Sequence, residues 1–443
     1  MKMNYRASSS AFLLGAIALL FIGVDCRPVE AQDASKTSAT NLTDAEVRET
    51  ILRVAHHQMV PLRDGDYSPV TTLAAAQQAA EPAGITWNNP YGVMLYGELR
   101  AAEALGDKES REFVLKHNQI ASRYYAWLKS LPATLTNVSS TQIEQFQNST
   151  ALNELMTFDK QGVMDPCATM GIAVLEGILH HADQSPSPEE KQLVQDIAEY
   201  IVHRQPRLPD GTFWRASWRG TVWADDLYKG CAFLTRWSEF TGDPKYLDDA
   251  ANQIINTSKL LQDKDGLWFH GYFYNEHKSN GAKWGRANGW AMIGTVETLS
   301  ALPANHPASP KILEILRRQI DGVEKVQARS GMWRQLLDRP ESWEETSGTA
   351  LFSYCIARAS ARGWIDATNM VVARKAFAAV CKHVKPDGAV TDVCEASGIF
   401  WGDYDFYMNR KRPEDEMHGR GPVMLAGAEI LLASRTNTPA KRP

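Results

Sequence analysis

Two aspartates stand where apolar, helix-length segments begin, and their chemistry suits general acid/base catalysis. Asp225 belongs to the sequence Trp-Ala-Asp-Asp at 223–226, and Asp165 is followed directly by Pro166. Two carboxyl groups that share a site from which water is excluded differ in pKa, so that one stays ionised and the other protonated. We therefore expect Asp165 and Asp225 to be the catalytic pair. The alternative is that each is only a helix cap, because an aspartate at a helix N-terminus is favoured locally.

Aromatic residues and a few cations accompany the two aspartates. Most of the 13 tryptophans lie in or beside the segments that precede apolar helices. The candidates for substrate contact are Tyr91, Trp223, His270, Trp284, Arg286, Trp290 and Trp401. Aromatic faces beside carboxylates describe a carbohydrate cleft, since they stack on the C–H faces of sugars while polar groups bind the hydroxyls. A core position is the alternative for each tryptophan, and a hydrogen bond to a loop is the alternative for the histidine.

Charge and motif content narrow the class of ligand. The net charge is −5 and there is no basic run, which argues against nucleic acid. Arg286 is a local cation among tryptophans and suits a ligand that carries a carboxylate, with an ordinary surface arginine as the alternative. No histidine pair of metal-binding spacing, no Gly-x-Ser-x-Gly elbow and no phosphate-binding glycine loop occurs, so we expect neither a metal nor another cofactor. The expected partner is an oligosaccharide, bound by a monomer.

The elements that must position these residues are almost all helical. From residue 42 onward the apolar periodicity is that of helices, with almost no strand alternation. The predicted helices are 43–59, 91–105, 109–131, 166–183, 187–204, 224–241, 244–263, 287–302, 308–326, 347–362, 366–384 and 421–435. Short turns join them in pairs, as at 241–244, where Gly242 ends one helix and Pro244 begins the next.

A turn followed by a short strand recurs between the helix pairs. Its four copies are Asp210-Gly211-Thr212-Phe213-Trp214, Asp265-Gly266-Leu267-Trp268, Ser330-Gly331-Met332-Trp333 and Asp387-Gly388-Ala389-Val390. Such repetition indicates helical hairpins that must pack on their neighbours to bury their apolar faces. Six hairpins can close into an all-α (α/α)6 barrel with short strands in the loops of one rim. An open helical solenoid is the alternative, but it has no need of uneven loops on one side.

The inner helices of this barrel would bring the candidate residues to one rim. They are expected to begin near Tyr91, Cys167, Asp225, Ala287, Ser347 and Gly421. Long polar loops precede these positions, and loops that gather on a rigid scaffold are where functional sites are built.

The two ends of the chain lie outside the expected barrel. Residues 1–31 have the pattern of a secretory signal, with Lys2 and Arg6 before an apolar run and a small-residue cleavage site at 29–31. The expected division is a signal at 1–31, a disordered lead-in at 32–42, the catalytic barrel at 43–436 and a tail at 437–443. We expect a secreted or periplasmic protein with no membrane contact once the signal is removed. The five remaining cysteines are odd in number and widely spaced, which favours buried thiols over disulfides.

Six motifs resemble those of a known enzyme family. They are Met-Asp-Pro-Cys-Ala-Thr-Met-Gly at 164–171, Val-Trp-Ala-Asp-Asp-Leu-Tyr at 222–228, Gly-Leu-Trp-Phe-His-Gly at 266–271, Trp-Gly-Arg-Ala-Asn-Gly-Trp at 284–290, Glu-Thr-Ser-Gly-Thr-Ala at 345–350 and His-Gly-Arg-Gly-Pro at 418–422. They cover most of the chain after the leader, in the order of the family, and the fourth is quite specific. On these motifs the chain resembles the unsaturated rhamnogalacturonyl hydrolases of glycoside hydrolase family 105 and, less closely, the unsaturated glucuronyl hydrolases of family 88.

The resemblance implies an (α/α)6 barrel and an uncommon hydrolysis. Such enzymes hydrate the C4=C5 double bond of a terminal unsaturated uronic acid left by a polysaccharide lyase, and the hemiketal that forms opens and releases the aglycone. By position, Asp225 resembles the general acid/base and Asp165 its partner carboxylate. The residues that resemble substrate contacts are Trp223, His270, Arg286, Trp290 and, more loosely, Trp401 and Tyr91.

Three segments depart from the family pattern and leave the aglycone open. They are 87–92, 133–160 and 399–403, which would contact the sugar beyond the uronate. Rhamnose, as in pectin side chains, is the default, and glucosamine is an alternative. Two other functions also stay open, namely a glycosidase on the same barrel that cleaves saturated linkages with two carboxylates, and a carbohydrate-binding protein without activity.

Overall fold

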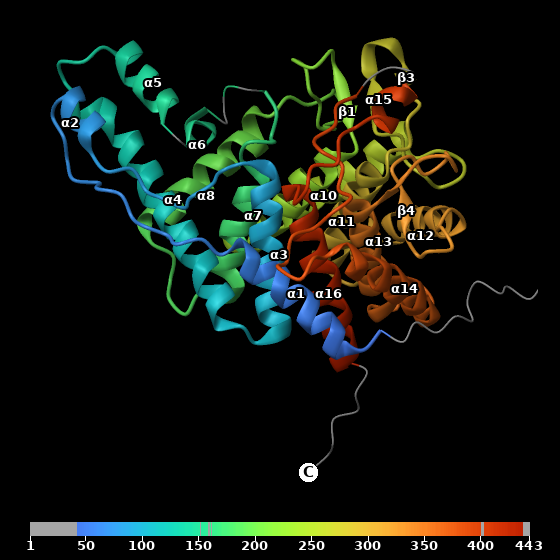
Figure 1. Ribbon diagram of the computed structural model, residues 1–443. Helices are drawn as coiled ribbons and strands as arrows, with labels where there is room; N and C mark the ends of the chain where they lie inside the picture. The colour runs from blue at the N-terminus through green and yellow to red at the C-terminus, as the bar shows by residue number, and fades with distance from the viewer. Residues whose placement is uncertain (1–41, 151, 158–159, 161, 400–402, 437–443) are drawn as a thin grey trace, which may run out of the picture. The chain divides into compact units, whose positions relative to one another are not determined.

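The computed structural model describes residues 42–150, 152–157, 160, 162–399 and 403–436 (Figure 1). All twelve predicted helices are present there, each within a few residues of its predicted ends. The inner helices are α3 (Asn89–Leu105), α7 (Ala168–Glu176), α9 (Ala232–Thr241), α11 (Gly285–Ala301), α13 (Thr346–Ala361) and α16 (Arg420–Thr436). The outer helices are α1 (Asp44–Gln58), α4 (Lys108–Thr134), α8 (Pro188–Glu199), α10 (Lys245–Leu261), α12 (Ser309–Lys325) and α14 (Met370–Val380). The helices are extended by π-helical turns at η2 (Gly177–His181), η3 (Tyr200–Arg204) and η4 (Leu227–Cys231).

The inner helices close a ring. α3 packs on α7, α7 on α9, α9 on α11, α11 on α13 and α13 on α16, and α16 returns to α3. In Figure 1 the red α16 lies beside α3 and α1, so the last helix and the first helix form the sixth pair of the barrel. This closure confirms the predicted (α/α)6 barrel.

Burial explains why a segment becomes an inner or an outer helix. In α11 every residue from Gly285 to Leu299 is buried, as expected of a helix that is surrounded by protein. In α12 the buried residues include Ile312, Leu316 and Ile320, which recur four apart along one face. Outer helices such as α12 therefore cover the ring with a single apolar stripe.

The repeated turn has the same geometry in all four copies. Gly211, Gly266, Gly331 and Gly388 have φ angles of 88°, 89°, 98° and 96°, in the left-handed region that favours glycine. The Asp or Ser before each glycine accepts a hydrogen bond from the N–H two residues after it. These turns lead the chain from an outer helix into the loop before the next inner helix.

Short strands lie in these loops, as predicted. β1 (Thr221–Trp223), β2 (Gly271–Phe273) and β3 (Lys278–Ser279) form one antiparallel sheet, and β4 (Trp333–Arg334) pairs with β5 (Glu344–Glu345). In Figure 1 β1, β3 and the short helix α15 (Tyr404–Met408) lie at the same end of the barrel. That end is the rim from which the inner helices begin.

Four short helices were not predicted, namely α2 (Leu73–Gln78), α5 (Ser140–Ser149), α6 (Asn153–Thr157) and α15. Each has ten residues or fewer, which is too short for a clear periodic pattern. α5 and α6 pack on α4, so they belong to the barrel domain. Among the described residues the five cysteines after the leader form no disulfide, and four of them are buried.

The expected signal, the lead-in up to residue 41 and the tail lie outside the described residues. Within the described part of the chain no helix is long and apolar enough to cross a membrane.

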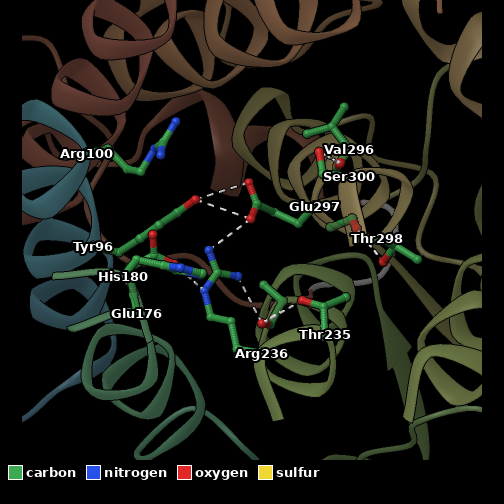
Figure 2. A network of polar contacts seen from close by, with 12 residues as sticks. Tyr96, Arg100, Glu176, His180, Thr235, Arg236, Val296, Glu297, Thr298 and Ser300 are labelled. Atoms are coloured by element: carbon green, nitrogen blue, oxygen red, sulfur yellow. Dashed lines mark hydrogen bonds and ion pairs between the residues drawn. The ribbon is translucent and has the colours of Figure 1, made fainter. Parts of the chain in front are cut away.

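A network of buried charges fills the barrel interior toward the C-terminal ends of the inner helices. Glu297 of α11 accepts hydrogen bonds from Tyr96 at 3.2 Å and from Arg236 at 3.0 Å (Figure 2). Arg358 of α13 contacts the other carboxylate oxygen of Glu297 at 2.5 Å. A cavity of about 490 Å³ borders the network. Arginines are favourable here because the C-terminal ends of helices carry partial negative charge.

Candidate active site

The register of β1 and β2 places Asp225 beside His270. Trp223 pairs with Gly271, and the N–H of Ala224 donates to the carbonyl of His270 at 3.0 Å. The chain then turns into η4, and Asp225 Oδ2 lies 3.2 Å from His270 Nε2. Both side chains are buried, and among the described residues neither of these two atoms has a well-directed hydrogen-bond partner. The pair therefore holds a carboxylate and an imidazole nitrogen that a ligand can still engage.

Two cations join Asp165 to this pair. Lys229 Nζ lies 2.6 Å from Asp165 Oδ1, and an Nη atom of Arg215 lies 2.8 Å from Asp165 Oδ2. Arg215 also binds Asp226 through its Nε at 2.9 Å. Lys229 lies on η4, four residues and about one helical turn after Asp225. The structure thus brings the two predicted catalytic aspartates, which precede neighbouring inner helices, into one charged cluster.

The cations of the cluster set the ionisation of both carboxyl groups. Burial alone would raise the pKa of Asp225, but three neighbours outweigh burial and hold that pKa well below its ordinary value. These neighbours are His270, Lys229 and Arg215. Burial also raises the pKa of Asp165, and Arg215 and Lys229 again outweigh it, so the pKa is lowered. The prediction that one carboxyl group stays protonated is therefore wrong for the free site. That prediction did not take the charges of Arg215 and Lys229 into account.

Trp223 covers the charged cluster. The centroid of its ring lies 5.1 Å from that of His270, and the guanidinium carbon of Arg215 lies 4.1 Å from the Trp223 ring. Trp218 meets Trp223 edge to face with 5.4 Å between ring centroids. Trp223 is only 5% exposed, whereas Trp218 is 50% exposed. Trp218 therefore presents an open aromatic face next to the cluster.

Trp284 and Trp290 are buried supports in this conformation. The ring of Trp284 packs on that of His270 with 4.7 Å between centroids, and its Nε1 donates to Gln335 at 2.9 Å. Trp290 stacks on Tyr228 with 5.2 Å between centroids. The two tryptophans are 1% and 4% exposed. Both tryptophans therefore occupy core positions in this structure, which was the alternative to substrate contact. Neighbouring rings pack against each of them.

Arg286 is also enclosed. Its side chain is 1% exposed, and its guanidinium donates to the carbonyls of Cys394 and Glu395 at 2.5 and 2.9 Å. A third bond goes to the hydroxyl of Ser347 at 3.2 Å. The expected contact with a ligand carboxylate is not available in this conformation, because the segment 394–395 would have to move first.

Of the two remaining predicted contacts, the structure describes Tyr91 at the start of α3. Tyr91 is buried in the first turn of α3. Just before it, Trp87 Nε1 donates to the carbonyl of Pro166 at 2.7 Å, which places this segment next to Asp165. Trp401 lies outside the described residues.

Sequence reasoning missed several members of the site. The positions of Arg215 and Lys229 in the sequence could have identified them. Arg215 directly follows a copy of the repeated turn, and Lys229 is one helical turn after Asp225. Glu154 of α6 left no such signal; burial and the charge of Asp165 raise its pKa. Within the described part of the chain, no group of three histidine, cysteine or acidic side chains could hold a metal ion.

Comparison with known proteins decides the family. A family model described as Glycosyl Hydrolase Family 88 matches residues 69–433. The chain belongs to glycosyl hydrolase family 88. It is a glycoside hydrolase, and the resemblance seen in the six motifs is confirmed.

Relatives of this family 88 protein share part or all of the barrel. Protein Atu3128 of Agrobacterium fabrum is 30% identical over 233 residues, which are 46% of this chain and 100% of that protein. Unsaturated rhamnogalacturonyl hydrolase YesR of Bacillus subtilis is 26% identical over 267 residues, which are 58% of this chain and 76% of that protein. A solved structure of a possible GH105 family member from Salmonella enterica is 23% identical, with a TM-score of 0.67, and the match covers 93% of this chain and 99% of that one. This last likeness supports the fold alone.

Proposed function

We propose that this family 88 protein hydrates the C4=C5 double bond of an unsaturated uronic acid at the non-reducing end of an oligosaccharide. The observation that carries the proposal is the buried Asp225–His270 pair, with 3.2 Å between Oδ2 and Nε2, beside the cluster that holds Asp165. A carboxyl group that exchanges a proton with an imidazole can serve as acid and then as base, which hydration of a double bond requires.

The steps of the reaction fall to separate residues. Asp225 gives a proton to C4, and the resulting carboxylate removes a proton from the water that adds at C5. Asp165 stays ionised between Lys229 and Arg215 and accepts hydrogen bonds from sugar hydroxyls. The hydrated sugar is a hemiketal, which opens and releases the aglycone without attack on the glycosidic carbon.

Sugar recognition falls first to the tryptophans of the β1 loop. The exposed face of Trp218 can stack on the aglycone, while Trp223 excludes water from the charged cluster. Arg286 joins the binding of the uronate carboxylate only if segment 394–395 releases it. We propose rhamnose as the aglycone, because the Bacillus subtilis relative is an unsaturated rhamnogalacturonyl hydrolase.

The test uses two unsaturated disaccharides that differ in their aglycone. One carries rhamnose, as released from rhamnogalacturonan, and the other carries an amino sugar, as released from a glycosaminoglycan. Hydration removes the conjugated double bond, so its ultraviolet absorbance falls. Loss with the rhamnose disaccharide alone supports the proposal, and loss with the amino-sugar disaccharide alone overturns the aglycone but not the reaction. No loss with either substrate, together with cleavage of a saturated oligosaccharide, would make the protein an ordinary glycosidase.

A further inference from the structure

The hydroxyl of Tyr407 contacts the Nδ1 edge of the His270 ring, whereas Nε2 is the nitrogen that faces Asp225. The hydroxyl oxygen lies 2.7 Å from His270 Nδ1, 2.9 Å from Asn280 Nδ2 and 3.0 Å from the carbonyl oxygen of Gly398. The tyrosine belongs to α15 and comes 137 residues after the histidine in the chain. Tyr407 and His270 are both 0% exposed, so bulk water does not compete for these bonds.

The direction of each hydrogen bond follows from the groups that cannot change role. The side-chain oxygen of Asn280 accepts from the N–H of Gly271 at 3.2 Å, so its Nδ2 faces Tyr407 as a donor. The carbonyl of Gly398 can only accept, so the hydroxyl of Tyr407 donates its proton there. The hydroxyl oxygen is then left to accept from the histidine ring. His270 Nδ1 therefore carries a hydrogen.

This assignment decides which ring nitrogen exchanges a proton. With Nδ1–H held by Tyr407, the atom of His270 that can gain or lose a proton is Nε2, which faces Asp225 at 3.2 Å. A neutral ring without the Tyr407 contact would place its proton on Nε2 as a donor to the Asp225 carboxylate. That tautomer cannot receive a proton from Asp225.

We propose that Tyr407 is a positioning residue that fixes the Nδ1–H tautomer of His270, so that the proton shared with Asp225 is always the one on Nε2. The kinetic part of this inference rests on the proposed function, whereas the tautomer does not. Tyr407 touches no reacting atom and acts only through the histidine.

The proton balance of the cycle is closed by this arrangement. The Nε2 proton of the imidazolium moves to Asp225 Oδ2, and Asp225 passes it to C4 of the sugar. The carboxylate then takes a proton from the water that bonds to C5 and returns it to Nε2. Throughout the cycle the Nδ1 proton stays on the ring, so no ring flip is needed.

Other charges face the Asp225–His270 pair and are the same in every variant of the test. They are Lys229 on η4, Arg215 before β1 and Asp165 before α7. The rings of Trp223 and Trp284 pack against the imidazole, with 5.1 and 4.7 Å between ring centroids. A shift in pH dependence caused by loss of the Tyr407 hydroxyl can therefore be read against an unchanged set of charges.

The test compares Tyr407→Phe with Tyr404→Phe. Tyr404 lies on the same short helix, but its hydroxyl donates to the carbonyl of Gly281 instead. Nitrogen-15 NMR of the histidine rings reports which nitrogen carries the proton, and the spectrum of His270→Gln identifies the signals of His270. At a pH where the ring is neutral, we expect the proton on Nδ1 in the wild type and in Tyr404→Phe, and on Nε2 in Tyr407→Phe.

The same variants are then assayed on the unsaturated disaccharide. Wrong-tautomer variants of catalytic histidines lose much of their turnover, so we expect kcat of Tyr407→Phe to fall about 10- to 100-fold with KM within about twofold, and its pH profile to shift. Tyr404→Phe should keep both constants. A neutral wild-type ring with its single proton on Nε2 would overturn the proposal even if Tyr407→Phe failed to fold. So would a neutral ring with its proton on Nδ1, or unchanged kinetics, in a folded Tyr407→Phe. If no unsaturated substrate reacts, the proposed function fails while the NMR result still decides the tautomer.

Discussion

Lys229 Nζ lies 2.6 Å from Asp165 Oδ1, although 64 residues separate the two in the chain. The contact joins the start of the third inner helix to the loop before the second. Because Lys229 also lies one turn after Asp225, a single cation lowers the pKa of both predicted catalytic carboxyl groups. Both aspartates of the free site are therefore held in their ionised forms.

Lys229→Gln should move the acid limb of the pH profile. Lys229 stabilises the ionised forms of Asp165 and Asp225, so its loss raises both pKa values toward their ordinary range. Activity that needs an ionised carboxylate fades as the pH falls through that pKa, so the acid limb of kcat/KM should shift to higher pH. The measurement is kcat/KM across the acid range. The control is Lys245→Gln, which removes an exposed partner of Asp243 and should leave the pH profile unchanged. An acid limb that moved to lower pH in Lys229→Gln would contradict the role of Lys229 in keeping the aspartates ionised.

Asp225→Asn should remove activity and keep the fold. The amide has nearly the same shape but cannot pass a proton to C4 or take one from water, and loss of a general acid/base lowers the rate about 10²- to 10⁴-fold. Absorbance loss on the unsaturated disaccharide measures the rate, and thermal unfolding measures the fold. Asp243→Asn changes an exposed aspartate of the α9–α10 turn and serves as the control. Turnover of Asp225→Asn within a few-fold of wild type would show that Asp225 is not the general acid/base.

The helices of the barrel were predictable because each carries a long apolar repeat. The three-residue strands could be predicted only as part of the repeated turn. Their pairing register could not be predicted, because so short a segment shows no alternation of apolar and polar residues. That register is what brings Asp225 to His270. Sequence reasoning could name the two residues as candidates, but it could not derive their contact.

Arg286 shows a second limit of the sequence. A cation among tryptophans suggested a ligand carboxylate, yet its two shortest hydrogen bonds go to backbone carbonyls 108 and 109 residues away. Carbonyl groups carry no sequence signal, so a buried structural arginine looks the same as a binding one. The role proposed for Tyr407 could not be predicted from the sequence either, because the direction of its hydrogen bonds depends on the backbone carbonyl of Gly398.

Glu297→Gln should destabilise the protein strongly. Glu297 pairs with Arg236 inside the barrel (Figure 2) and also with Arg358. Removing one member of a buried ionic network leaves uncompensated charge, at a cost of about 3–5 kcal/mol. The free energy of unfolding in urea measures the loss. Glu103→Gln breaks a pair with Arg100 at a partly exposed side chain and should cost less than about 1 kcal/mol. Equal losses in the two variants would argue against the network as a source of stability.

The same glutamate should also give the protein part of its acid sensitivity. Burial raises the pKa of Glu297, but Arg358 and Arg236 outweigh it and lower the pKa from 4.5 to about 2. A depressed pKa contributes stability that is present above pH 4.5 and is lost as the pH falls from 4.5 to about 2. Glu297→Gln should flatten the pH dependence of unfolding in that window, and an unchanged slope would contradict the shifted pKa.

Gly266→Ala should separate the two reasons for glycine in the repeated turn. Gly211 and Gly266 share the left-handed conformation, with φ of 88° and 89°, so both variants bear the strain of a side chain there, which is about 1–2 kcal/mol. A Cβ on Gly211 meets open space, whereas a Cβ on Gly266 would lie 2.0 Å from the carbonyl oxygen of Arg318 in α12. Gly266→Ala must therefore also push α12 away from the turn. We expect its loss of unfolding free energy to exceed that of Gly211→Ala clearly, and equal losses would mean that the turn does not pack on α12 as the structure places it.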